Sequence, residues 1–167
     1  NKYTALNKRY MAAKTAAAKL SILESEAAAY ADTKYDAMIK KNITTQKNTL
    51  CKPAWDALQK KLKPVAPKPP KPKKGEKPKK IPAPKAPTGA ALIALYEGAL
   101  PSLAGSMYEG MAKKSIMLEK DKMATPGYTK MIAAMKKNKK LTSAQKVDML
   151  TSALPTYKGT KYEKMIQ

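Results

Sequence analysis

The sequence predicts an all-α protein of degenerate tandem helical repeats, with about three short helices in each unit, joined by an extended Pro/Lys-rich linker. Two observations carry this prediction. Residues 15–63 align without a gap on residues 88–136, and thirteen of the forty-nine paired positions are identical. Residues 63–87, between the two copies, contain nine prolines and nine lysines. A repeat shifts the functional question from catalysis to what the copies hold together.

Shorter matches extend the repeat in both directions. A third copy begins at Thr142 and stops in mid-unit, and Tyr3 to Arg9 aligns with Trp55 to Lys61, the last element of a unit. The numbered chain therefore resembles a window on a longer array. The predicted organisation is the end of a preceding unit at 1–14, repeat 1 at 15–62, the linker at 63–87, repeat 2 at 88–138 and a partial repeat 3 at 139–167.

Helix-start signals occur at the same places in each copy. The first helix is expected to begin at a threonine whose hydroxyl can accept from a free backbone N–H, namely Thr15, Thr88 or Thr142. In the third copy Gln145 completes a capping box with Thr142. The second helix is expected to begin with a hydroxyl and a carboxylate three residues apart, at Thr33 and Asp36, Ser106 and Glu109, or Thr160 and Glu163. The third helix is expected to open at Pro53 or Pro126, because proline suits a first helical turn.

The N-terminal segment has a helical seam. Tyr3, Leu6, Tyr10, Ala13, Ala17 and Leu20 recur at spacings of three and four, and no Gly or Pro occurs from Tyr3 to Tyr30. This pattern indicates a helix face that packs within its own unit, or alternatively an intermolecular coiled coil.

Aromatic, methionine and lysine residues recur on predicted helix faces. This pattern has two interpretations. The aromatic and methionine side chains fill small cores, or the aromatic, methionine and lysine residues together form one docking epitope that is presented several times. Each unit is also small enough to need a neighbour or a partner to complete its core. The candidate partner-binding residues are Tyr35, Met38, Lys40, Lys41, Trp55, Tyr108, Met111, Lys113, Lys114, Tyr128, Tyr162 and Met165.

Charge points to acidic partners. The chain has 34 basic and 12 acidic residues, for a formal net charge of +22. Only Arg9 among the basic residues is not lysine, and lysine lacks the forked geometry that arginine uses to contact base edges. The composition therefore disfavours sequence-specific nucleic-acid recognition and leaves phosphate-backbone binding open.

The linker is expected to be an extended basic tether. Its proline density favours polyproline II at about 3.1 Å per residue. The Lys-Pro-Ala run Lys79-Lys80-Ile81-Pro82-Ala83-Pro84-Lys85-Ala86-Pro87 resembles the tails of linker histones and Pro-Ala-Pro-Lys tracts of some large-DNA-virus proteins. This resemblance is compositional and implies no site at the level of single residues. The tether lysines are Lys68, Lys71, Lys73, Lys74, Lys77, Lys79, Lys80 and Lys85.

The sequence contains few side chains that are suited to catalysis. Histidine, the commonest general base and metal ligand, is absent, and the only cysteine is Cys51. No Cys-x-x-Cys motif or glycine-rich phosphate loop occurs. We therefore expect no catalytic residue, no cofactor, no metal site and no small-molecule substrate. The longest strongly apolar stretch, residues 90–100, is too short to cross a bilayer and contains Glu97.

Two functional classes are compatible with these observations. The first is a non-enzymatic scaffold or linker protein that fastens subunits of a large assembly, whose partners are acidic protein surfaces. The alternative is a sequence-independent nucleic-acid packaging protein. The repeat favours the scaffold, because it retains aromatic, methionine and capping positions, whereas abundant lysine suits both classes.

Overall fold

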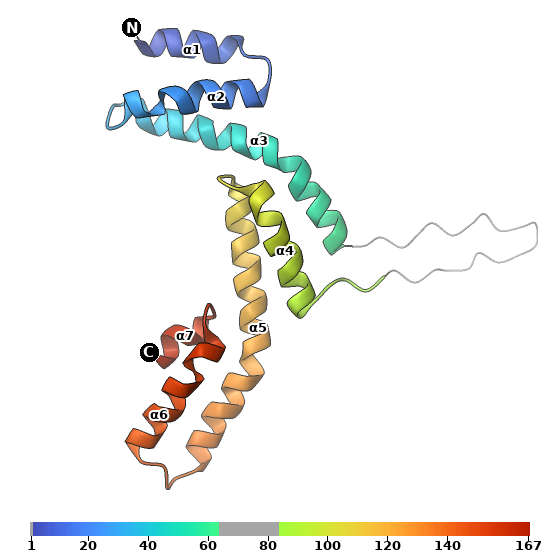
Figure 1. The fold of residues 1–167 in the computed structure, drawn as a ribbon, viewed down its shortest axis with the longest axis vertical. Helices are drawn as coiled ribbons and strands as arrows, with labels where there is room; N and C mark the ends of the chain where they lie inside the picture. Colours follow the sequence, from blue (N-terminus) through green and yellow to red (C-terminus); the bar gives the residue numbers. More distant parts are fainter. Residues whose placement is uncertain (1, 64–83) are drawn as a thin grey trace, which may run out of the picture. The chain divides into compact units, whose positions relative to one another are not determined.

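The computed structural model describes residues 2–63 and 84–167. These residues form seven α-helices and two 3-10 helices, and no strand is found among them, which confirms the all-α prediction (Figure 1). The α-helices are α1 (Lys2–Ala12), α2 (Ala16–Glu26), α3 (Asp36–Leu62), α4 (Gly89–Leu103), α5 (Met107–Lys137), α6 (Ser143–Ala153) and α7 (Lys161–Ile166). The 3-10 helices η1 (Ala27–Tyr30) and η2 (Leu154–Tyr157) directly follow α2 and α6.

The described residues divide into two compact units. The first contains α1, α2, η1, α3 and residues 98–112, and the second contains residues 85–97 and 113–167. These units cut through α4 and α5, so they do not coincide with the predicted repeat boundaries, which remain predictions. The linker predicted at 63–87 falls between the last residue of α3 and the first of α4, and its residues 64–83 lie outside the described part of the chain.

In the first unit, α1 and α2 lie side by side, and α2 packs along α3 (Figure 1). Their core contains Leu6, Leu23, Tyr30 and Ile39, with Tyr3, Tyr10, Ile22, Ala27, Tyr35 and Ile43 packed around it. The seam residues of α1 thus pack within the unit, as the first of the two seam interpretations requires. The seam is nevertheless not one helix, because α1 ends at Ala12 and the extended Thr15 caps a new helix.

The prediction of a separate third helix at Pro53 and Pro126 is wrong. Both prolines lie inside long helices, α3 and α5. An interior proline removes one backbone hydrogen bond and costs about 3 kcal/mol. Burial beyond each proline offsets this cost, since Leu58 and Leu62 are buried after Pro53, and Met135 is buried after Pro126. The predicted second and third helices of each unit are therefore one long helix, α3 in the first copy and α5 in the second.

Threonine caps begin two of the short helices as expected. The Thr15 hydroxyl accepts from the Ala18 amide, and Thr142 and Gln145 form the predicted capping box. At Thr33, Ser106 and Thr160 the carboxylate three residues later does not accept from the expected amide, so the predicted capping boxes are not formed there.

Replacement of Thr142 by alanine is expected to lower the free energy of unfolding by about 1 kcal/mol, because the Gln145 amide loses its acceptor at the start of α6. Urea denaturation followed by circular dichroism measures the change. Thr142→Ser keeps the hydroxyl and should unfold within a few tenths of a kcal/mol of the parent chain. Equal losses in the two variants would contradict the capping role.

Candidate interaction site

Three stacked aromatic pairs join segments that are distant in the sequence. Tyr3 stacks on Tyr35 with ring centroids 4.0 Å apart and an interplanar angle of 5°. Trp55 stacks on Tyr108 at 5.3 Å and 19°, within the first unit. In the second unit, Tyr128 stacks on Tyr162 at 4.3 Å and 24°. The first partner in each pair occupies one aligned position of the sequence, and the second partner occupies another. We call each pair an aromatic joint.

In two of the joints, a third tyrosine packs edge to face against both stacked rings. Tyr30 meets Tyr3 and Tyr35 edge to face at 6.0 and 6.3 Å. In the second unit, Tyr157 meets Tyr128 and Tyr162 at 5.7 and 6.1 Å. Edge-to-face and offset-stacked rings attract through their quadrupoles, so each cluster is held by more than buried area.

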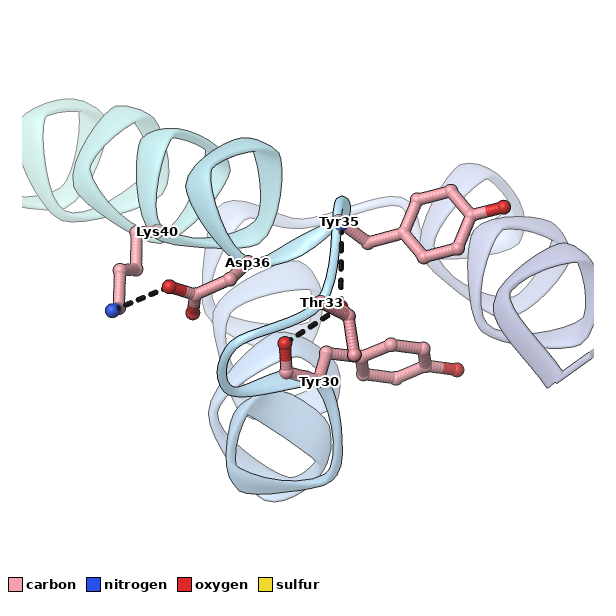
Figure 2. A network of polar contacts seen from close by, with 5 residues as sticks. All are labelled: Tyr30, Thr33, Tyr35, Asp36 and Lys40. Carbon is pink, nitrogen blue, oxygen red and sulfur yellow. Dashed lines mark hydrogen bonds and ion pairs between the residues drawn. The ribbon is translucent and has the colours of Figure 1, made fainter.

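A hydroxyl fixes the turn that leads into each joint. The side chains of Thr33, Ser106 and Thr160 donate to the carbonyls of Tyr30, Leu103 and Tyr157 at 2.7, 2.6 and 2.6 Å. Thr33 and Thr160 also accept from the amides of Tyr35 and Tyr162, both at 3.2 Å. Figure 2 shows the Thr33 contacts, with the Tyr30 and Tyr35 rings on one side of the turn and Asp36 and Lys40 on the other. The hydroxyl thereby fixes the backbone that carries the stacking tyrosine.

The carboxylates expected to complete capping boxes bind elsewhere. Glu109 and Glu163 accept from the amides of Gly105 and Gly159, at 2.7 and 2.8 Å, one residue before the expected donors. Both glycines have positive φ, 71° and 75°, and this left-handed turn aims the amide at the carboxylate. The shorter Asp36 instead accepts from Lys40 at 2.7 Å, and this bond raises the pKa of Lys40.

Two joints have a further cap supplied by the neighbouring long helix. The Asn48 side chain of α3 accepts from the Met107 amide, the first residue of α5, at 2.7 Å. The Asp121 side chain of α5 accepts from the Lys161 amide, the first residue of α7, at 2.7 Å. These positions align with each other in the sequence. A negative or polar acceptor at a helix N-terminus satisfies a free donor and favours the helix dipole.

An ion pair recurs beside these caps. Lys47 pairs with Glu24 at 2.8 Å in the first unit, and Lys120 pairs with Glu97 at 3.3 Å in the second. Arg9 pairs with Glu26 and thereby links α1 to α2. Such partly exposed pairs contribute at most about 1 kcal/mol each, so they orient the helices more than they stabilise them.

The twelve predicted partner-binding residues separate into two groups. Tyr35, Trp55, Tyr108 and Tyr128 are half-buried in the joints, and Tyr162 is buried. The methionines and lysines face solvent, as Met38, Met111 and Met165 are exposed, together with Lys40, Lys41, Lys113 and Lys114. The structure therefore brings the aromatic members together within the chain and leaves the methionine and lysine members on the surface.

The predicted tether lies almost wholly outside the described residues. Lys68, Lys71, Lys73, Lys74, Lys77, Lys79 and Lys80 belong to residues 64–83, and Lys85 is described and exposed.

Sequence reasoning missed several members of the joints. Tyr3, Tyr30 and Tyr157 complete the ring clusters, and Asn48 and Asp121 cap the following helices. The alignment carried a usable signal, since it pairs Tyr30 with Tyr157 and Asn48 with Asp121.

The described part of the chain shows neither a metal site nor a membrane-spanning helix. Residues 2–63 and 84–167 hold no group of three or more His, Cys, Asp or Glu side chains placed to bind a metal. No helix among them is both long and apolar enough to cross a membrane. No protein-family model matches the chain, and no curated protein or solved structure is significantly similar to it.

Replacement of Asp121 by alanine is expected to lower the free energy of unfolding by about 1 to 2 kcal/mol, because the Lys161 amide loses its acceptor. Asp121→Asn should lose much less, since Asn48 makes the same bond to Met107 with a neutral amide. Urea denaturation gives both values. A loss in Asp121→Asn as large as in Asp121→Ala would mean that the charge, and not the cap, is what stabilises the joint.

Glu119 should make the fold sensitive to acid. Its Oε1 accepts from the Gly89 amide at 2.8 Å, and this bond, with help from Lys122, lowers the pKa of Glu119 below its usual 4.5. The stabilisation is present above the ordinary carboxyl pKa and disappears as pH falls through the lowered one. The urea midpoint of the second unit should therefore fall as the pH is lowered below the ordinary carboxyl pKa, and Glu119→Gln should flatten this dependence. An unchanged slope in Glu119→Gln would assign acid sensitivity to other carboxylates.

Proposed function

We propose that this protein is a non-enzymatic scaffold or linker that fastens subunits of a large macromolecular assembly through repeated helical docking motifs and a basic extended tether. One observation carries the proposal. Met38, Met111 and Met165, which the alignment pairs, have exposed fractions of 44%, 43% and 62%. Their aligned aromatic neighbours are held in joints within the chain. Each copy thus offers a partly exposed methionine side chain on a helix fixed by a similar joint, and in the first copy the Met38 sulfur also accepts from the Tyr3 hydroxyl at 3.0 Å.

Methionine and lysine suit a docking surface of this kind. Methionine is flexible and polarisable, and it adapts to apolar partner surfaces of varied shape. The exposed lysines at 40, 41, 113 and 114 supply positive charge near Met38 and Met111. Such a surface complements an acidic partner with an apolar centre, in which the charges steer the encounter and the methionines provide burial.

Multiple copies would raise avidity. Weak contacts that are joined by a linker bind as an intramolecular set, with an effective concentration fixed by the length and stiffness of the linker. The Pro/Lys-rich residues 63–87 have the composition of a semi-rigid spacer. This arrangement suits a chain that spans equivalent positions on neighbouring subunits.

The second candidate is a sequence-independent nucleic-acid packaging protein. The formal net charge of +22 favours it, because lysines that neutralise phosphates release condensed counterions. The stacked aromatics do not add to this candidate, since rings that face one another within the chain offer no open platform for bases.

Sedimentation of the native protein from its source, at moderate salt and with or without nuclease, separates the two functions. Continued co-sedimentation with a discrete protein assembly after nuclease treatment is the result expected of the scaffold. Release by nuclease would make nucleic acid the partner and replace the proposed function with the alternative.

The docking surface itself is tested with the variant Met38→Ser, Met111→Ser and Met165→Ser. Binding to the assembly should fall at least about tenfold, because three apolar contacts are lost together while every ring of the joints is kept; Met38→Ser removes in addition the sulfur that accepts from the Tyr3 hydroxyl. The matched control is Met11→Ser, Met117→Ser and Met149→Ser, which alters exposed methionines at other positions. Equal binding by the two variants would refute the methionine surface. Changing Tyr35, Tyr108 and Tyr162 is the poorer test, since it dismantles the joints.

A further inference from the structure

A groove of about 310 Å³ lies in the second unit, beside its aromatic joint. Its apolar walls come from α4, α5 and η2, with Ile93, Met123, Ala124 and Tyr157 among the lining residues. Its polar positions are Lys120, Lys158, Thr156 and Thr160. Met123 is 53% exposed although it lines an apolar groove, so its side chain has surface left to bury. This volume is at the lower end of ligand pockets, about 300 Å³, and suits one or two apolar side chains.

A second groove adjoins the first through Lys158. It has a volume of about 320 Å³ and is lined by Leu154, Pro155, Lys158 and Glu163. Glu163 is already engaged, because it accepts from the Gly159 amide at 2.8 Å. The exposed ammonium group of Lys158 thus belongs to two partly apolar grooves at once.

The aligned position of the first unit is arranged differently. There the side chain of Lys47 lies over Gly105, with its Cδ and Nζ 3.0 and 3.2 Å from the position that a Cβ would occupy. Around Gly159 of the second unit the corresponding space is open, with no heavy atom within 4 Å. Lys120, aligned with Lys47, keeps the equivalent ion pair, with Glu97 in place of Glu24, but does not lie over Gly159. The open space beside Gly159 therefore distinguishes the second unit.

We propose that these two grooves bind an acidic peptide segment of a partner protein, in which apolar side chains flank one or two carboxylates. The apolar residues would enter the grooves on either side of Lys158, and a carboxylate would contact its ammonium group. Charge complementarity selects this occupant, since the chain carries a net charge of +22 and the central polar group is a cation. The inference takes from the proposed function only the acidic class of the partner.

The walls favour a peptide over a nucleic acid. Tyr157 is only 6% exposed and is packed edge to face against Tyr128 and Tyr162, so its face is not open for base stacking. Lys120 is already paired with Glu97 at 3.3 Å, which leaves Lys158 as the other lysine that lines the grooves, whereas a nucleic-acid backbone is bound through several phosphate contacts. A short peptide needs a positive contact only at Lys158.

The probe is a fluorescein-labelled peptide of twelve residues with two leucines on either side of two glutamates, titrated with the full chain and followed by fluorescence anisotropy. Lys158→Glu should weaken binding at least about fivefold, the equivalent of an exposed ion pair of about 1 kcal/mol. The matched control, Lys164→Glu, makes the same charge change at an exposed α7 residue that does not line either groove, and should weaken binding less than about twofold.

The apolar walls are tested separately. Met123→Ser should weaken binding about fivefold, whereas Met149→Ser, on α6 and outside both grooves, should leave it unchanged. Equal effects of Lys158→Glu and Lys164→Glu, or equal binding of a peptide with serines in place of the leucines, would refute the grooves and show general charge attraction. Competition by a DNA duplex that is lost in Lys158→Glu but kept in Lys164→Glu would overturn the peptide assignment.

These outcomes are independent of the proposed function. The peptide titration uses neither the assembly nor the Met38, Met111 and Met165 surface. Release by nuclease in sedimentation would remove the scaffold function and leave the titration result in place. Failure of the titration alone would remove the grooves and leave the scaffold function unaffected.

Discussion

The aromatic joint is the contact on which the rest of the structure depends. The chain has no phenylalanine and one tryptophan, so tyrosine supplies most of the large ring area available to its small cores. A joint places one ring from a long or N-terminal helix against a tyrosine at the start of another, as in Tyr3 on Tyr35. Stacked pairs contribute about 0.5 to 1.5 kcal/mol beyond their buried area. For cores this small, that increment and the hydroxyl-fixed turn hold the stacking tyrosine and the residues next to it against the partner ring.

The caps make the joints directional. A ring pair alone permits rotation about the stacking axis, whereas a hydrogen bond from a helix N-terminus to a side chain of another helix fixes one end. Asn48 does this for α5, and Asp121 does it for α7. Because the amide bound is the first of each helix, the cap also satisfies a donor that has no partner within the helix. Within each unit, stack and cap together hold the first turn of the helix that follows against the long helix that supplies the cap.

Much of this arrangement could be predicted from local sequence, and the failures have physical causes. Helix content and the Thr15 and Thr142 caps were predictable, because an N-cap depends on neighbouring residues alone. The helix break expected at Pro53 failed because burial of Leu58 and Leu62 beyond the proline outweighs a missing hydrogen bond. Only the members of the joints could be predicted, since the alignment identifies equivalent aromatic residues. It cannot say whether those residues face solvent or one another. That distinction depends on contacts between residues far apart in the chain.

The use of the aromatics inside the joints constrains what the surface can do. A docking epitope that relied on the same rings would have to break a stack in order to bind, so affinity would be reduced by the free energy of the joint. The exposed faces of the methionine and lysine side chains can be covered without breaking a ring stack, so binding there costs mainly rotamer freedom. The same reasoning applies to the first groove beside Lys158, because Tyr157 lines that groove while its ring remains in the aromatic cluster. Binding there would use a surface that the joint has built without dismantling the joint.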